Sequence, residues 1–327
     1  MPPYVFLAGF LCILSIILPT RATAGNEYYA DPVKGNAANP GTLAAPYKTV
    51  AKSISRLTPG DTLYLREGTY WESDISIAVH GTASGPITIR NYPGEKPIID
   101  GGYGEFRTIG NDDWELVDGS THLYRSKKTY PDPGLVHGYF EWEGRHYKMV
   151  PYESFGHIAT ANQYYTETGN TYVGPGTCWK RPEQRIYVRL QQTNLAMENR
   201  YDLPALPPNP RQVKLCLFPG REVLLLRSSA AYLHLEGLNI RFQNNAIEIL
   251  PGAHHITVKN CQILGGRYHI LAREGTHDLL FDGITIDDGV PDWIAWTDVK
   301  SGQKPAHSFQ NAAFNLRSYN VEVKNCL

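Results

Sequence analysis

The sequence predicts an all-β solenoid, a parallel β-helix, for three reasons. An eight-residue pattern recurs in the last third of the chain with starts 23 residues apart: LHLEGLNI from Leu233, ITVKNCQI from Ile256 and LLFDGITI from Leu279. The fifth residue of each copy is Gly or Asn, which tolerate the left-handed backbone of a sharp corner between two strands. An apolar pair precedes each copy at a fixed spacing and supplies a third strand. Such a unit buries its apolar side only by stacking on its neighbours as rungs.

Two further copies extend the pattern in both directions. ITIRNY starts at Ile87, and VEVKNCL starts at Val321, 42 residues after the copy at Leu279, which leaves room for an excursion near 289–307. The expected corner residues are Asn91, Gly237, Asn260, Gly283 and Asn325. The third-strand pairs are Leu224 with Leu226, Ile247 with Ile249, and Ile270 with Ala272. Because the sequence stops inside a rung at Leu327, we expect it to be a fragment of a longer chain.

The first part of the chain divides into a targeting segment and the start of the solenoid. Residues 5–18 are almost wholly apolar and small residues follow at Ala22-Thr23-Ala24, so residues 1–24 are predicted to be a signal peptide, with a retained anchor as the alternative. The mature protein is then secreted or periplasmic and does not contact a membrane. In residues 25–102, Thr49 is the expected N-cap of a short helix that covers the first rung with Val50, Ile54 and Leu57.

Residues 103–221 interrupt the repeat, and residues 222–327 resume it. The interruption holds three of the six tryptophans and the strand-like segments RIYVRL and VKLCLF, and it predicts an inserted β-rich subdomain whose aromatic residues mostly form its own core. Cys261 and Cys326 occupy equivalent positions two rungs apart, ~9–10 Å, which is beyond the reach of a disulfide. Cys178 and Cys216 therefore remain the plausible disulfide pair.

The charge balance narrows the choice of partners. The 327 residues include 31 basic and 32 acidic side chains, for a formal net charge of −1, and no basic run stands out. Nucleic acid is therefore not an expected partner. We expect a monomer.

The N-terminal segment YYADPVKGNAANPGTLAAPYKTVAKSISRLTPGDTLYLREGTY, followed by GPITIRNYPGEKPIIDGG, resembles the opening of exported right-handed β-helix proteins of the pectate-lyase-like superfamily. The resemblance covers about residues 27–102 and 222–327. It implies a right-handed parallel β-helix with a substrate groove along the strand that precedes the corner-bearing pair. Because that superfamily holds lyases, hydrolases, epimerases and non-catalytic adhesion modules, the resemblance leaves the reaction open.

Placing that groove on this sequence selects polar residues by strand alternation. The catalytic candidates are Glu248, His269, Arg273 and Arg317. The substrate-binding candidates are Arg267, Asn315 and His307, and the metal candidates are Asp287, Asp288 and Asp292. We expect Glu248 and Leu271 to share one rung position, Arg273 to align with Asn315, and the site residues to project into one groove.

Two reactions could use this set. β-Elimination on a uronic acid needs a cation for the substrate carboxylate and a base for the C5 proton. The three aspartates would hold Ca²⁺, Arg273 or Arg317 would hold the carboxylate, and His269 or a lysine would be the base. Glycoside hydrolysis needs two carboxylates instead, and Glu248 with Asp287 or Asp288 is the available pair.

The prediction is an enzyme that cleaves an acidic, pectate-like polysaccharide by β-elimination. The alternatives are a glycoside hydrolase on the same scaffold and a non-catalytic adhesion or glycan-binding module. Simpler structural roles compete for several of the same residues. Asp287 and Asp288 would form a polar turn, and His254 and His277 would stack on successive rungs. Glu236, Lys259, Asp282 and Lys324 would form a column of alternating charge on a solvated face.

Overall fold

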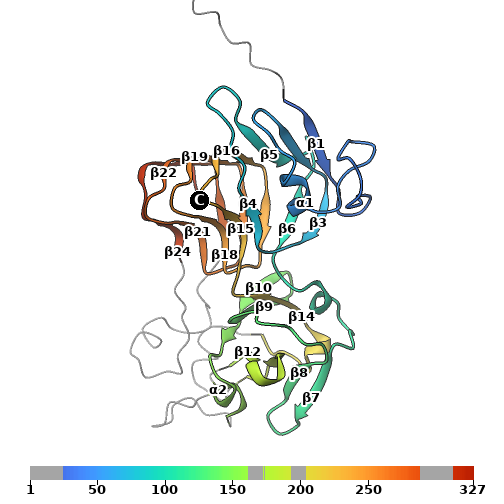
Figure 1. The fold of residues 1–327 in the computed structure, drawn as a ribbon. Helices are drawn as coiled ribbons and strands as arrows, with labels where there is room; N and C mark the ends of the chain where they lie inside the picture. The colour runs from blue at the N-terminus through green and yellow to red at the C-terminus, as the bar shows by residue number, and fades with distance from the viewer. Residues whose placement is uncertain (1–24, 161–171, 173, 193–203, 288–311) are drawn as a thin grey trace, which may run out of the picture.

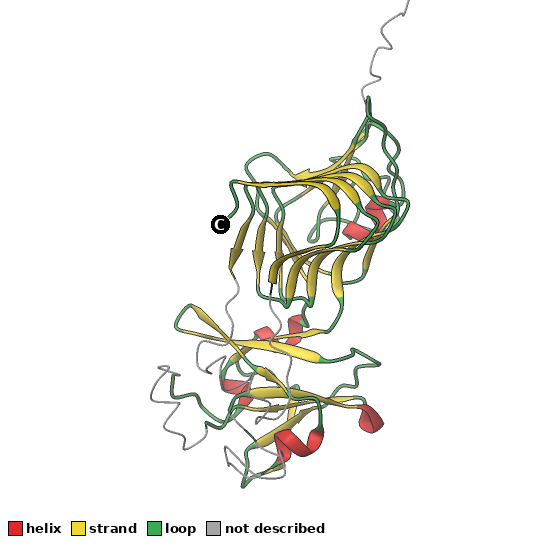
Figure 2. Cartoon of the chain, turned by 90° about the vertical axis from the view of Figure 1, so that its left-hand side faces the viewer, coloured by secondary structure: helices red, strands yellow, loops and turns green. Residues whose placement is uncertain are grey.

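Three parallel sheets build the solenoid in the computed structural model, which describes residues 25–160, 172, 174–192, 204–287 and 312–327. Sheet 1 has the order β1-β2-β5-β16-β19-β22-β25, sheet 2 the order β24-β21-β18-β15-β4, and sheet 3 the order β23-β20-β17-β6-β3. Each complete rung contributes one strand to each sheet, the first and last rungs being incomplete, and Figure 2 shows the rungs stacked in parallel. The predicted all-β parallel β-helix is confirmed.

The strand bounds follow the predicted repeat. Sheet 1 consists of β1 (Glu27–Ala30), β2 (Thr62–Leu65), β5 (Ile87–Asn91), β16 (Ala231–Glu236), β19 (His254–Lys259), β22 (His277–Asp282) and β25 (Tyr319–Lys324). Sheet 2 consists of β4 (Ile75–Ile77), β15 (Glu222–Leu226), β18 (Asn245–Ile249), β21 (Tyr268–Ala272) and β24 (Ala312–Leu316). Sheet 3 consists of β3 (Gly68–Trp71), β6 (Pro97–Asp100), β17 (Asn239–Arg241), β20 (Gln262–Leu264) and β23 (Thr285–Asp287).

The register between rungs is the one that the 23-residue repeat predicts. Leu233 pairs with Ile87 and Ile256, and Ile256 pairs in turn with Leu279, which pairs with Val321. These side chains enter one hydrophobic core together with the third-strand residues. Full burial of one such side chain stabilises a protein by about 1.5–3 kcal/mol, so the stacked column supplies much of the driving force for the solenoid.

Four of the five expected corners have the left-handed backbone. The φ angles are 63° at Gly237, 51° at Asn260, 68° at Gly283 and 54° at Asn325. The fifth prediction, a corner at Asn91, is wrong. Asn91 is not among the residues with positive φ and is the last residue of β5. A five-residue loop joins β5 to β6, and Gly94 with a φ of 79° supplies the left-handed residue there. Asn91 instead donates from Nδ2 to the carbonyl oxygen of Glu95 at 2.9 Å.

A second left-handed column lies five residues before the predicted corners. Tyr232, His255, Asp278 and Asn320 have φ angles of 48°, 53°, 56° and 53°. These bulky residues gave no Gly-type signal in the sequence, so the column was not expected. The two columns flank four strands of sheet 1, β16, β19, β22 and β25, so the chain changes direction near both ends of each of these strands.

The two simple side-chain columns predicted for sheet 1 are present. His254 and His277 stack with ring centroids 5.1 Å apart and an interplanar angle of 6°. Glu236, Lys259, Asp282 and Lys324 share one register position. Lys259 lies 3.7 Å from Asp282, whereas Lys324 forms its ion pair with Glu322 of its own strand at 3.1 Å.

The short helix α1 (Val50–Ile54) begins where the sequence predicts. The Thr49 side chain accepts a hydrogen bond from the Lys52 backbone N–H at 3.3 Å. Val50, Ile54 and Leu57 are buried in the same core as the solenoid strands. Its role as a lid over the first rung stays a prediction. No helix in the described part of the chain is long and apolar enough to span a membrane.

Residues 103–221 form two separate sheets beside the solenoid, and we call this part the insert. One sheet orders β11-β12-β13-β8-β7 and the other β10-β9-β14. The strands are β7 (Trp114–Asp118), β8 (Leu123–Ser126), β9 (Val136–Trp142), β10 (Arg145–Lys148), β11 (Val150–Pro151), β12 (Gly176–Lys180), β13 (Arg185–Arg189) and β14 (Lys214–Pro219). Helix α2 (Phe155–Ala159) and the 3₁₀ turns η1 (Gly104–Arg107), η2 (Arg181–Glu183) and η4 (Pro210–Gln212) complete it. In Figure 1, β9, β10 and β14 lie nearest the solenoid.

The insert contacts the solenoid through buried side chains. Tyr139, Cys216 and Phe218 of the insert pack with Phe242 of the solenoid in one cluster. Lys148 donates from Nζ to the carbonyl oxygen of Gly266 at 2.6 Å. The cysteine pair that the sequence left as plausible is not bridged: Cys178 lies in β12 and Cys216 in β14, on different sheets, and both are buried free thiols. Cys261 is a buried free thiol as expected, and Cys326 is a half-buried one.

Candidate active site

The outward side of sheet 2 carries most of the predicted site residues. Ser76, Leu225, Glu248, Leu271 and Asn315 stand at one register position on five successive rungs. Glu248 and Leu271 were expected to share that position, and they do. The expected alignment of Arg273 with Asn315 is wrong by two residues, because Leu271 pairs with Asn315. The excursion before β24 hid the true register of the last rung.

Glu248 and Arg273 meet across neighbouring rungs. Arg273 approaches Glu248 Oε1 with both Nε and Nη2 at 2.7 Å, while Asn245 donates from Nδ2 to Glu248 Oε2 at 3.0 Å. The Glu248 side chain is 6% exposed and that of Arg273 is 46% exposed. The carboxylate is therefore buried and held by donors, whereas the guanidinium still reaches solvent.

Glu222 is a second carboxyl group beside Glu248, and sequence analysis did not select it. Asn245 also lies 3.3 Å from Glu222 Oε1, so one amide connects the two glutamates. Burial raises the pKa of Glu222 to about 6, and a side-chain hydrogen bond with Glu248 and charge repulsion from it add to the shift. A signal existed, because Glu222 stands one repeat before Asn245 and pairs with it. The result is a carboxyl group that changes protonation near neutral pH beside a carboxylate held by an arginine.

One register position of sheet 2 directly follows the inward residues Leu226, Ile249, Ala272 and Leu316. Three of its four residues are arginines. The residues at that position are Arg227, Leu250, Arg273 and Arg317. Backbone hydrogen bonds between rungs continue through this position. The Arg273 N–H donates to the Ile249 carbonyl oxygen at 3.0 Å, and the Arg317 N–H donates to the Ala272 carbonyl oxygen at 2.9 Å. All three arginines are exposed. Rungs are ~4.8 Å apart, so this arginine column presents positive charge over about 15 Å of the face. Arg227, which sequence analysis did not select, donates from Nε to Ser76 Oγ at 2.8 Å.

His269 and Arg267 lie at the other end of β21, toward the insert. His269 is 2% exposed, and its Nδ1 donates to the carbonyl oxygen of Ala312 at 3.1 Å. Burial, together with the positive charges of Lys148 and Arg267, lowers the pKa of the insert residue His137 to about 3. Lys148 is buried, and its amine contacts the Gly266 carbonyl oxygen just before β21, so it lies close to this end of sheet 2. The irregular insert gave no register from which sequence analysis could place it.

Asp287 does not join the other predicted residues. It is the last residue of β23 on sheet 3, where its carbonyl oxygen accepts a hydrogen bond from the Gly265 N–H at 3.0 Å. Asp288, Asp292, His307 and the excursion at 289–307 lie outside the described residues, as does the predicted signal peptide at residues 1–24. Asp287 belongs to no group of three or more metal-binding side chains in the described part of the chain. The Ca²⁺ site therefore stays a prediction that depends on residues the structure does not describe.

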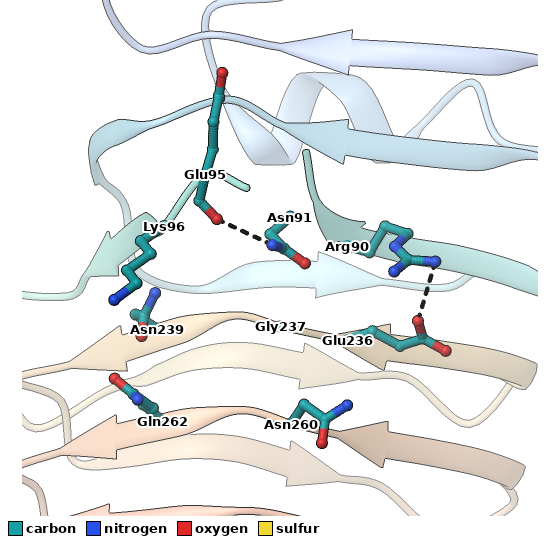
Figure 3. Close-up of a pocket in the computed structure, with 9 residues that line it drawn as sticks. All are labelled: Arg90, Asn91, Glu95, Lys96, Glu236, Gly237, Asn239, Asn260 and Gln262. Atoms are coloured by element: carbon teal, nitrogen blue, oxygen red, sulfur yellow. Dashed lines mark hydrogen bonds and ion pairs between the residues drawn. The ribbon is translucent and has the colours of Figure 1, made fainter. Parts of the chain in front are cut away.

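A second polar groove, with a cavity volume of about 280 Å³, lies at the corner between sheets 1 and 3 (Figure 3). Its lining residues are Arg90, Asn91, Glu95, Lys96, Glu236, Gly237, Asn239, Asn260 and Gln262. Arg90 lies 3.3 Å from Glu236, and Glu95 lies 2.7 Å from Arg66. Arg90, Glu236 and Glu95 in this groove are therefore engaged in local ion pairs. The exposed arginine column of sheet 2 is the better candidate for binding an anionic ligand.

Comparisons with known proteins agree with this fold. Residues 28–123 match the family model described as "Pel9A-like, right handed beta helix region". The chain is 41% identical over 166 residues to pectate lyase PEL9 of Emericella nidulans, which covers 49% of this chain and 35% of that protein. It is 34% identical over 104 residues to the uncharacterized protein YwoF of Bacillus subtilis, covering 30% of this chain and 22% of that protein.

A solved structure, "The complex structure of XylC with xylose", superimposes with a TM-score of 0.50 and 12% identity over 80% of this chain and 56% of that one. At that identity the likeness concerns the fold alone. The three sheets and the family match together define a right-handed parallel β-helix protein. The match to the Pel9A-like model is confined to the N-terminal part of the chain, residues 28–123. The chain spans about a third or less of the length of these two curated relatives.

Proposed function

We propose that this protein is an exported polysaccharide lyase that cleaves an acidic, pectate-like polysaccharide by β-elimination. The observation that carries the proposal is the arginine column Arg227, Arg273 and Arg317 beside the Glu222–Glu248 carboxyl pair on one face. The similarity to a pectate lyase supports both the substrate class and the secreted location.

The reaction assigns a role to each of these groups. A guanidinium of the column binds the substrate carboxylate and thereby stabilises the negative charge that develops when the C5 proton leaves. Glu222, with a pKa of about 6, accepts that proton in its ionised form. The C4–C5 double bond then forms, the glycosidic C4–O bond breaks, and the leaving oxygen takes a proton from solvent water. Glu222 is favoured over His269 as the base because the His269 side chain is buried, whereas Glu222 is only half-buried.

The hydrolase alternative fits this geometry less well. Glycosidases separate their two carboxyl groups by roughly 5 Å or more to leave room for the sugar or for water. Glu222 and Glu248 are close enough to influence one another through a hydrogen bond. The pair expected from sequence, Glu248 with Asp287, is split between sheets 2 and 3.

Incubation of the purified chain with polygalacturonate tests the proposal. A lyase generates a conjugated double bond that absorbs in the near ultraviolet, whereas a hydrolase yields reducing ends without that absorbance. Arg273→Gln should lower the rate, and Lys259→Gln, which removes an exposed cation from sheet 1, should not. Reducing ends without absorbance would establish the hydrolase, and binding without either product would establish a glycan-binding module.

A further inference from the structure

Two neighbouring rungs of sheet 1 carry metal-binding side chains at the same place. β19 begins with His254-His255 and β22 begins with His277-Asp278, and His254 pairs with His277. The next residues along, His255 and Asp278, are therefore also stacked one above the other. This group lies at the start of the sheet 1 strands, and His277 follows Arg273 of the arginine column by four residues.

The left-handed column explains how consecutive residues come to point the same way. In a regular strand, successive side chains face opposite sides of the sheet. His255 and Asp278 have φ angles of 53° and 56°, which breaks that alternation. As a result, His255 turns toward His254, and Asp278 turns toward His277. Left-handed backbone at residues other than Gly or Asn is costly, and it is found most often at functional sites.

The distances suit a shared cation. His277 Nδ1 lies 2.7 Å from Asp278 Oδ2, and His255 Nδ1 lies 3.5 Å from the same oxygen. The ligand atoms of His255, His277 and Asp278 all lie within 4.8 Å of one another. Ligands of a tetrahedral zinc ion at 2.0–2.1 Å are separated by ~3.3 Å, so small side-chain rotations would bring these three into place. His254 Nδ1 lies 2.8 Å from His255 Nδ1, so His254 borders the group without belonging to it.

Surrounding side chains hold this group in position. Tyr232 stacks on His255 with a centroid distance of 4.4 Å, and Tyr319 stacks on His277 at 4.9 Å. Asn320 donates from Nδ2 to Asp278 Oδ1, which leaves Oδ2 to face the histidines. An amide that fixes the non-ligating oxygen of a carboxylate is a common outer support of metal sites. The side chains of His255, His277 and Asp278 are 41%, 27% and 28% exposed, so an ion can enter from solvent.

We propose that His255, His277 and Asp278 bind a transition-metal ion of the zinc class. Imidazole nitrogens combined with one carboxylate favour Zn²⁺ and similar ions, whereas Ca²⁺ and Mg²⁺ require sites built mainly from oxygen. The site is independent of the proposed lyase activity. It would clamp β19 to β22 and keep one coordination position open to solvent.

Titration of the untagged, chelator-treated chain with ZnCl₂ in a calorimeter tests the site. We expect one zinc ion per chain, a rise in thermal unfolding temperature with zinc, and no such response to CaCl₂. Cobalt at the same site should give a visible absorption band that zinc removes. His255→Asn and Asp278→Asn remove a ligand while retaining a residue type that tolerates the left-handed backbone, so both variants should fold and lose zinc affinity.

Two further variants distinguish loss of a supporting residue from loss of a histidine outside the site. Asn320→Gly removes the support of Asp278 and should weaken zinc binding by about 10-fold, less than the loss of a ligand. His234→Gln removes a histidine of β16 that lies outside the group and should bind zinc as the parent chain does. The proposal is overturned if the folded parent chain shows no saturable binding up to millimolar zinc. It is equally overturned if His255→Asn and Asp278→Asn bind zinc unchanged, because the ion would then sit elsewhere.

Discussion

Arg273 Nη2 lies 2.7 Å from Glu248 Oε1, and this contact joins β21 to β18 through a carboxylate that is almost fully buried. Removing the arginine alone leaves a buried negative charge without its cation, which destabilises a protein more than removing both partners does. We expect Arg273→Leu to lower the free energy of unfolding by about 1–2 kcal/mol, less than a fully buried pair would cost because the guanidinium is half exposed. Urea denaturation measures the change.

A double variant provides the check on this explanation. Glu248→Leu combined with Arg273→Leu should recover most of the stability lost by Arg273→Leu alone. If the double variant is less stable than the single one by the full cost of Glu248→Leu, the two side chains do not interact in the folded state.

Glu222 should make both activity and stability depend on pH near 6. Its pKa is raised from the ordinary value of 4.5 to about 6, so between these pH values the folded state binds more protons than the unfolded state. Stability contributed through this group therefore falls as pH rises from about 4.5 through 6. Over the same interval the base becomes ionised, so kcat/KM should rise.

Glu222→Gln provides the comparison. The variant should lose the acidic limb of the kcat/KM profile together with most of the activity, and its stability relative to the parent should improve as pH rises from 4.5 to 7. Because Glu222 and Glu248 titrate together, the measured pKa belongs to the pair. A parent profile that is flat between pH 5 and pH 7 would contradict this role.

The corner at Asn260 should not accept a β-branched residue. Its φ is 51°, and Val resists that region because its branched side chain clashes with the backbone. We expect Asn260→Val to lower the free energy of unfolding by ~1 kcal/mol or more. Lys259→Val, one residue earlier in an extended strand, serves as the control and should be close to neutral. Equal stability of the two variants would contradict the corner assignment.

The repeat alone was enough to predict most of the solenoid. Apolar alternation and the 23-residue spacing fixed the register of Leu233, Ile256, Leu279 and Val321, because a shift by one residue would turn each of them to solvent. The corner at Asn91 could not be distinguished by residue type, since the same Asn can form a corner or bond to a longer loop. In the structure its amide fills the space beside Gly237, where an added Cβ would lie 2.1 Å from Asn91 Oδ1.

The candidate site was harder to predict than the fold. Glu248 and Arg273 were selected correctly as neighbours because both lie on regular strands. Arg317 was placed two residues out of register, because an excursion of unknown path precedes β24. Lys148 comes from the insert, whose position against the solenoid depends on packing that carries no repeat in the sequence. Residue spacing therefore predicts contacts within the solenoid and does not predict those made by the insert.

The cysteines should behave as free thiols of very different reactivity. Burial raises the pKa of Cys178, Cys216 and Cys261 to about 12, so almost none of their thiolate form exists at neutral pH. Cys326 is only half-buried. In the native protein, an alkylating reagent should modify Cys326 and leave Cys178, Cys216 and Cys261 intact, whereas each of these four thiols should react in denaturant. Peptide mapping by mass spectrometry distinguishes the sites. Reduction before alkylation should not change the pattern, and a peptide pair linking Cys178 to Cys216 in the unreduced protein would reinstate the disulfide that the structure does not contain.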